Sequence, residues 1–273
     1  MNAGYLNLPP KYNNVIDFNG NIQQNVQNQY IKSLELGYGA NYKRFALNVN
    51  GYYTNWQNKP VDSPPSYTNP VDGKIIYYNI PNINALHKGI ELDVKYKPHR
   101  KVSLGALAAL GDWRYTSGGT AYLYDNAVLL KTIVFSAKNV HVGNSAQNQV
   151  GGNVRYEPFK NFYVKLNYTY FGKMYANFDP SVLQVTPGAD YRDHESWKMP
   201  SYYFVDFFTG YSYKLSPKEE ILLMVSVTNL FDVKYITDGS FPSGTPPPLY
   251  NATNASVYMN MGRRYNVSVR LNF

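Results

Sequence analysis

The sequence predicts an all-β protein, in which an antiparallel sheet of about nine long strands forms part of a transmembrane β-barrel. Three observations predict this fold class. Successive segments alternate strictly between apolar and polar side chains, as strands with one apolar and one wet face do. The connections between these segments are short and long in turn. The chain ends in Phe273, which lies on the apolar face of the last alternating segment.

Nine segments show this alternation. In the first, Leu34, Leu36 and Tyr38 face away from Glu35 and Gly37. The other predicted strands lie at 45–54, 86–96, 102–108, 150–156, 162–170, 203–213, 221–229 and 264–273. Strands of roughly 10–14 residues are long for a soluble sheet, but they have the length that tilted membrane strands need.

The connections predict the orientation of the strands. Short turns fall at 42–45, 97–101, 157–161 and 215–219. Between them lie long segments rich in Gly, Pro, Asn and Ser, at 57–83, 115–144, 175–199 and 233–261. Membrane barrels join their strands by tight periplasmic turns and long extracellular loops, whereas a soluble sandwich has no reason to keep its long loops at one end. The last strand is therefore expected to run towards the periplasm.

The composition agrees with strands that face lipid. Hydrophobic residues make up 44% of the 273 residues, yet the mean hydropathy is −0.42, so apolar and polar residues are interleaved. No stretch approaches the roughly 20 apolar residues of a membrane-spanning helix. The 28 tyrosines suit the bilayer interface, because the ring is apolar and the hydroxyl prefers water, although Tyr is also a good strand former.

Charge and cysteine content exclude several function classes. The chain has no cysteine, and therefore no disulfide, thiolate metal site or cysteine nucleophile. The formal net charge is +8, but the basic residues are scattered and form no dense run or RNA-binding motif, so we expect no nucleic-acid partner. We expect the barrel to contact outer-membrane lipid and the basic residues to contact lipopolysaccharide phosphates.

An odd number of strands predicts an incomplete barrel. Nine strands leave the first and last strands parallel, whereas bacterial single-chain barrels have an even number, and each unpaired backbone group in lipid costs several kcal/mol. We therefore expect 32–273 to be the carboxy-terminal part of a larger barrel. Residues 1–31 are expected to be an extracellular loop or the end of a preceding strand. The first residues lack the basic and apolar regions of a signal peptide, which indicates a mature or truncated chain.

Several motifs resemble those of TonB-dependent outer-membrane receptors, in particular receptors of Bacteroidetes type. The most specific is Asn229-Leu230-Phe231-Asp232 with Tyr235, combined with the closing strand that ends in Phe273. Weaker similarities lie at 34–38, 84–92 and 142–147, and the resemblance extends from about Ile31 to the end. The closing strand also resembles those that the barrel-assembly machinery recognises, through Tyr265, Val267, Val269, Leu271 and Phe273.

The resemblance implies a 22-stranded barrel whose lumen holds an amino-terminal plug. Receptors of this family take up siderophores, haem, cobalamin or glycans across the outer membrane, with energy from TonB. The plug, the TonB box and the earlier strands have no counterpart in this sequence. The TonB complex is therefore expected to act only through the missing plug, and the implied function is part of such a transporter.

The loops carry the candidate ligand-binding residues. Aromatic rings in extracellular loops stack on sugars or on aromatic siderophores, although the same rings could line the membrane interface or pack the loops together. The residues predicted to contact a ligand are Tyr78, Tyr175, Tyr191, His194 and Trp197. His194 lies in an acidic cluster whose spacing matches no metal motif, so no metal site is predicted. The sequence contains no nucleophile elbow and no phosphate-binding glycine loop, and we expect neither an enzyme nor a cofactor.

Two alternatives remain from the sequence. A small self-contained outer-membrane pore or adhesin requires an additional strand within residues 1–31, where the region around Val15, Ile22 and Val26 shows no clean alternation. A soluble carbohydrate-binding β-protein should fold in buffer without detergent, whereas exposed Tyr, Val and Leu bands predict aggregation there.

Overall fold

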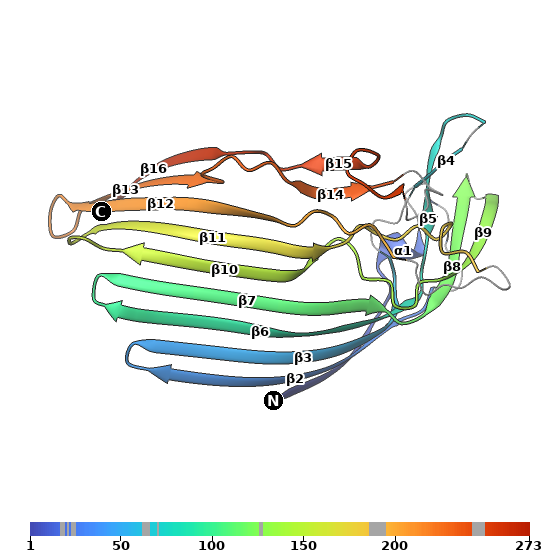
Figure 1. Cartoon of the computed structure of the whole chain (residues 1–273), viewed down its shortest axis with the longest axis horizontal. Helices are drawn as coiled ribbons and strands as arrows, with labels where there is room; N and C mark the ends of the chain where they lie inside the picture. Colours follow the sequence, from blue (N-terminus) through green and yellow to red (C-terminus); the bar gives the residue numbers. More distant parts are fainter. Residues whose placement is uncertain are drawn as a thin grey trace.

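The computed structural model describes residues 1–16, 20, 22, 26–61, 66–69, 71–125, 128–185, 195–241 and 249–273. Among these residues, ten strands form one antiparallel sheet in the order β1-β2-β3-β6-β7-β10-β11-β12-β13-β16. Figure 1 shows them side by side as a long, curved sheet. Nine of the ten are the predicted strands, and the all-β barrel-segment fold class is confirmed.

The strands of the large sheet are β1 (Asn2–Leu8), β2 (Gln29–Tyr42), β3 (Phe45–Lys59), β6 (Ile83–His99), β7 (Val102–Tyr115), β10 (Ala146–Tyr156), β11 (Phe162–Met174), β12 (Tyr202–Lys214), β13 (Glu220–Thr228) and β16 (Arg264–Asn272). The loops contain a short helix, α1 (Tyr12–Val15), and two small sheets. One small sheet contains β4 (Ser66–Thr68), β5 (Ile75–Asn79), β8 (Gly118–Asp125) and β9 (Val128–Ser136), and the other contains β14 (Ile236–Ser240) and β15 (Ser256–Met259). Within the described segments, no helix is long and apolar enough to cross a membrane.

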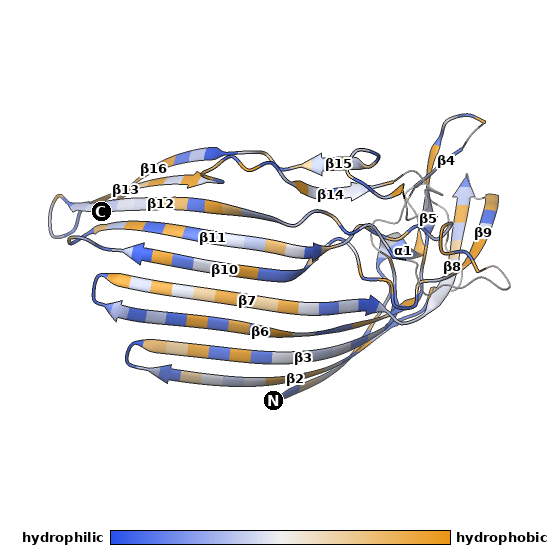
Figure 2. Cartoon of the chain, in the orientation of Figure 1, coloured by the Kyte–Doolittle hydropathy of each residue, from blue (hydrophilic) through white to orange (hydrophobic). Residues whose placement is uncertain are grey.

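The register of the large sheet separates an apolar outer face from a polar inner face. On the outer face, Leu47 pairs with Val94, which pairs with Ala106. One residue further along, Asn48 pairs with Asp93 on the inner face. Figure 2 shows the resulting alternation of hydrophilic and hydrophobic residues along strands such as β6 and β10. Many outer-face side chains, such as Leu36, Tyr38 and Ile90, are exposed to the surroundings, as in lipid-facing strands.

The short and long connections lie at opposite ends of the sheet (Figure 1). The four short turns follow β2, β6, β10 and β12, whereas the small sheets belong to the long loops at the other end. The larger of two buried apolar clusters among the described residues also lies at this loop end, where residues of β5, β8 and β9 pack against Tyr115 and Phe178. The large sheet therefore supports a packed cap of loops.

Strand β1 gives the sheet an even number of strands. It pairs antiparallel with β2, from Asn2 opposite Glu35 to Leu8 opposite Gln29. The additional strand that a self-contained barrel requires therefore exists within residues 1–31. However, β1 and β16 occupy opposite edges of the sheet, and no pairing joins them in the part of the chain that the structure describes.

The Asn-Leu-Phe-Asp segment ties the loop ends of β13 and β16 together. The side chain of Asn229 accepts a hydrogen bond from the Val233 N–H at 2.9 Å and donates one to the Val233 carbonyl at 2.9 Å. A carboxylate oxygen of Asp232 accepts a hydrogen bond from the Arg263 N–H at 2.8 Å, directly before β16. Gly262 lies beside this bond with a φ of +71°, a left-handed conformation that favours glycine.

We expect Gly262→Ala to destabilise the protein by about 1–2 kcal/mol. A Cβ at this position would lie 2.8 Å from the Lys234 Nζ and 2.9 Å from an Asp232 carboxylate oxygen, and the backbone would be strained as well. Urea unfolding in lipid vesicles measures the change. Gly152→Ala is the matched control, because the nearest atom to its added methyl group is 3.8 Å away. Equal stability of the two variants would contradict a structural role for the Asp232–Arg263 bond.

Candidate functional site

Three aromatic rings line the inner face at the loop end of the sheet. Trp56 comes from β3, His87 from β6 and Trp113 from β7. The register places His87 opposite Trp113 and next to Trp56, with ring centroids 5.5 and 6.0 Å apart. We call these three residues the aromatic wall. All three are half-buried, so their rings form part of the surface that faces the lumen.

Hydrogen bonds fix the two indoles of the aromatic wall. The Trp113 Nε1–H donates to the Tyr52 hydroxyl oxygen at 2.8 Å, and the Trp56 Nε1–H donates to the Gln29 Oε1 at 3.0 Å. A glycine at position 89 makes room for the first bond, because a Cβ there would lie 2.5 Å from the Tyr52 hydroxyl oxygen. The rings are therefore held in position before any ligand arrives.

A cavity of about 260 Å³ lies against the aromatic wall. It is also lined by Lys59, whose Nζ lies 5.3 Å from the centre of the Trp56 ring. The remaining lining combines amide and hydroxyl groups with the aromatic and apolar side chains of the loop end: Tyr115, Val142, Gly143, Asn144, Ser145 and Asn177. Such a surface offers aromatic stacking, a positive charge and hydrogen-bond donors to one small ligand.

A second cavity, of about 450 Å³, lies on the inner face near β16. Tyr235 lies at its edge and stacks on Tyr202 with ring centroids 4.0 Å apart. Burial and the nearby Asp206 carboxylate raise the pKa of the Tyr235 phenol. Asp206 also accepts a hydrogen bond from the Asn229 N–H at 2.8 Å, so this carboxylate connects the cavity to the Asn-Leu-Phe-Asp segment.

The structure places the predicted ligand residues among packed loops. Tyr78 is only 1% exposed and belongs to the larger apolar cluster, whereas Trp197 is 6% exposed and packs edge-on against Phe241. Tyr175 stacks on His141 with ring centroids 4.1 Å apart. Tyr191 and His194 lie outside the residues that the structure describes. Ligand contact by these five residues stays a prediction.

Hydrogen bonds between His141 and Glu195 fasten one of these loops. His141 Nδ1 lies 2.5 Å from the Glu195 Oε2, and the His141 N–H donates to the Glu195 Oε1 at 3.0 Å. Burial raises the pKa of the Glu195 carboxyl, but hydrogen bonds from His141 and from the Ser196 N–H outweigh it, so the pKa lies below its ordinary value. No group of three or more His, Asp or Glu side chains within the described ranges is arranged to hold a metal ion.

The comparison with protein families decides the identity of the fold. Residues 3–230 match the family model described as "TonB dependent receptor-like, beta-barrel". The chain belongs to the TonB-dependent receptor family. Barrels of this family lie in the bacterial outer membrane, and this location is therefore assigned to the chain. The predictions of family and location are confirmed, and the soluble alternative is wrong.

Solved receptors have the same fold at low sequence identity. The ferric yersiniabactin uptake receptor FyuA from Yersinia pestis is 17% identical, with a TM-score of 0.55 over 98% of this chain and 32% of that chain. The copper transporter OprC is 12% identical, with a TM-score of 0.63 over 99% of this chain and 36% of that chain. The siderophore receptor PiuA from Acinetobacter baumannii is 16% identical, with a TM-score of 0.60 over 94% and 30%.

The chain spans about a third of the length of these receptors. No curated protein sequence matches it. The exposed outer face of β16 agrees with the expected recognition of the closing strand, since Tyr265 and Val267 are 68% and 67% exposed and Phe273 is 94% exposed. Recognition by the assembly machinery itself stays a prediction.

We expect the contact between Glu195 and His141 to make loop stability depend on pH. Because the pKa of Glu195 is lowered by folding, the carboxylate stabilises the fold above about pH 4.5, its ordinary pKa, and this stabilisation is lost as the pH falls through the folded-state value. Below pH 4.5, the amides of Ala176 and Met199, which bond to Trp197 and Met174, should exchange faster. Hydrogen–deuterium exchange, corrected for the intrinsic pH dependence, measures this change.

Glu195→Gln should lose most of this protection already at pH 7, because a neutral amide is a weaker hydrogen-bond acceptor than a carboxylate. Glu219→Gln, at a short turn on the opposite end, is the control and should leave the exchange of both amides unchanged. The same pH profile in wild type and Glu195→Gln would show that another group controls the loop.

Proposed function

We propose that the chain forms part of an outer-membrane TonB-dependent transporter that binds a small ligand at the aromatic wall and takes it up actively. The observation that carries this proposal is the position of Trp56, His87 and Trp113 on the inner face, at the extracellular end of the strands and against a cavity of about 260 Å³. A ligand that enters between the loops meets these rings before it reaches the middle of the lumen.

Among siderophores, haem, cobalamin and glycans, a metal chelate with aromatic or anionic groups is the ligand class that the aromatic wall favours. Tryptophan rings stack on aromatic chelators and on sugars alike. The Lys59 ammonium beside Trp56 adds a positive charge, which attracts the carboxylate or catecholate groups of ferric chelates. Two receptors of similar structure, the ferric yersiniabactin uptake receptor FyuA and the siderophore receptor PiuA, support the same class.

Energy for uptake is expected to come from TonB through a plug domain inside the barrel. Neutral sugars lack the negative charge that Lys59 would attract, and glycan uptake is therefore the second candidate. The prediction that the chain is not an enzyme is supported by the family, whose members are receptors and transporters.

We expect Trp56→Ala to weaken ligand binding about tenfold, because it removes one stacking ring and leaves the β-sheet ladder unchanged. Isothermal titration of the full-length protein with a ferric tris-catecholate, haemin, cyanocobalamin and a malto-oligosaccharide measures affinity and identifies the ligand class. Uptake of the tightest-binding probe should require TonB. Tyr38→Ala is the matched control, since Tyr38 is 65% exposed on the outer face of β2.

If Trp56→Ala binds a ligand as tightly as wild type does, the aromatic wall is not part of the binding site. If the malto-oligosaccharide binds more tightly than the other probes, the ligand is not a metal chelate, but the proposed location of the binding site still holds. Uptake that persists without TonB would contradict active transport and favour a passive pore.

A further inference from the structure

The ring nitrogens of His87 have no hydrogen-bond partner among the residues that the structure describes. The two neighbouring indoles direct their N–H groups elsewhere, since Trp113 donates to Tyr52 and Trp56 donates to Gln29. Ring contacts with the two indoles hold the imidazole in place but leave its nitrogens unpaired. Because proteins rarely leave such a half-buried polar group unpaired, the imidazole is available to a ligand in the cavity.

The cavity beside His87 suits a compact, anionic molecule. Its volume of about 260 Å³ lies below the roughly 300–1,000 Å³ of drug-sized ligand sites, so the bound molecule must be small. Lys59 lines the cavity, with its Nζ 5.3 Å from the centre of the Trp56 ring and 3.2 Å from the Pro60 carbonyl oxygen, to which it donates. These contacts place the ammonium at the cavity, where its positive charge favours carboxylates on the ligand.

Metal coordination is the chemistry that a neutral imidazole adds to this cavity. Histidine is the commonest metal ligand in proteins and is largely neutral at pH 7. Within the described ranges, however, no three His, Asp or Glu side chains are arranged to hold a metal ion, and a single imidazole does not hold a bare cation. A metal that binds His87 must therefore arrive with most of its coordination positions already filled by a chelator.

We propose that His87 binds the metal of a compact, carboxylate-bearing chelate directly, through an imidazole nitrogen. The nitrogen lone pair takes a coordination position that water held before, and the water leaves without any change in oxidation state. Because His87 belongs to the aromatic wall, the metal bond rests on the proposed function. The ligand class narrows to chelates with an exchangeable position and excludes those whose metal is fully enclosed, such as a ferric tris-catecholate.

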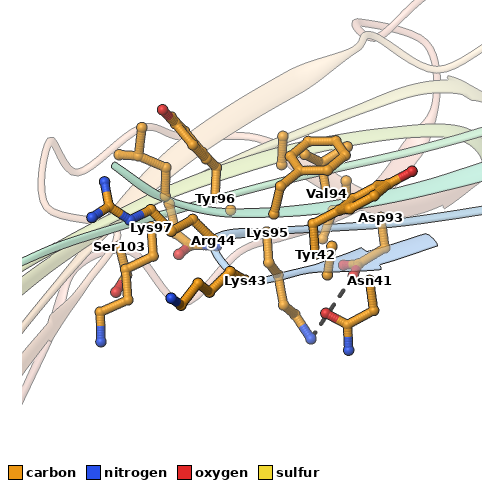
Figure 3. Close-up of a pocket in the computed structure, with 17 residues that line it drawn as sticks. Asn41, Tyr42, Lys43, Arg44, Asp93, Val94, Lys95, Tyr96, Lys97 and Ser103 are labelled. Atoms are coloured by element: carbon orange, nitrogen blue, oxygen red, sulfur yellow. Dashed lines mark ion pairs between the residues drawn. The ribbon is translucent and has the colours of Figure 1, made fainter. Parts of the chain in front are cut away.

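A cavity of about 400 Å³ at the short turns lacks this combination of groups (Figure 3). Tyr42 and Tyr96 extend to one side of the sheet there, and Lys95 extends to the other, where a dashed line marks its 3.8 Å ion pair with Asp93. None of the described residues that line this cavity is a histidine. Because rings and cation lie on opposite faces, Lys95 offers a control for charge without stacking or metal binding.

Isothermal titration of the tag-free, full-length protein in detergent tests this proposal with two copper(II) chelates. In copper(II) nitrilotriacetate water holds exchangeable positions, whereas in copper(II) EDTA the chelator fills them. Wild type should bind the nitrilotriacetate chelate about tenfold more tightly, although EDTA carries more negative charge and attraction to Lys59 alone would give the opposite order. The electron paramagnetic resonance spectrum of wild type should show nitrogen hyperfine splitting from one imidazole, which tests the bond without any variant.

His87→Phe keeps an aromatic ring and removes the two nitrogens. This variant should bind copper(II) nitrilotriacetate on the order of 10- to 100-fold more weakly, as is usual when a metal site loses a contact, and should lose the hyperfine splitting. His99→Gln is the matched control, because His99 is exposed at a short turn, and it should keep both. Lys59→Gln should weaken binding of both chelates, whereas Lys95→Gln should weaken neither. Far-UV circular dichroism must show that each variant keeps the strand signal of wild type.

The proposal is overturned if folded His87→Phe binds copper(II) nitrilotriacetate as tightly as wild type does. It is also overturned if wild type binds the two chelates equally, which indicates a hydrogen bond or charge attraction alone, or if His99→Gln rather than His87→Phe loses the splitting, which indicates copper on an exposed histidine only. Trp56→Ala separates these results from the proposed function. If Trp56→Ala weakens binding and His87→Phe does not, the aromatic wall remains the site without a metal bond. If only His87→Phe weakens binding, the metal bond holds and stacking on Trp56 does not.

Discussion

The rest of this structure depends on the ladder of backbone hydrogen bonds between neighbouring strands. Hydrocarbon offers no partner to a peptide group, so each N–H and C=O at membrane depth must bond to the next strand. Pairing from β1 to β13 and on to β16 meets this requirement along most of the sheet, with register irregularities between β3 and β6 and between β6 and β7 and unpaired edges at β1 and β16. Strand length, alternation and the position of the turns all follow from maintaining that register across a bilayer.

Because the ladder rather than a packed interior holds the strands together, the apolar side chains of the sheet are free to face lipid. Conventional hydrophobic packing occurs instead at the loop end, where Ile83, Tyr115 and Phe135 are at most 2% exposed. The molecule therefore combines two kinds of stability: backbone hydrogen bonds with a lipid-facing surface in the sheet, and burial of apolar side chains in the cap. The aromatic wall lies where these two regions meet.

The sequence was sufficient to predict the nine long strands and their connections because alternation and turn composition are local properties. For residues 1–31 the sequence left open an extracellular loop or the end of a preceding strand, because β1 is short, its alternation breaks at the adjacent Tyr5 and Leu6, and Pro9 and Pro10 follow it directly. The aromatic wall was missed for another reason. Alternation places His87 on the inner face, but its proximity to Trp113 and Trp56 depends on the register between three strands. Conversely, Tyr78 and Trp197 were chosen for their position in loops, and their burial depends on packing between distant segments.

The two buried clusters have a consequence for how receptors of this kind can diverge. The first contains residues of three long loops, from Val61 through Phe135 to Leu183, and the second joins Trp197 and Met199 to Phe241 in the last loop. The segment after β11 contributes to both clusters, so the long loops pack together as one unit. Exchanging a single loop between paralogues would expose apolar surface on its former neighbours. New ligand specificity should therefore be inherited by recombination of the whole cap, or by point substitutions at residues that line cavities without belonging to either cluster.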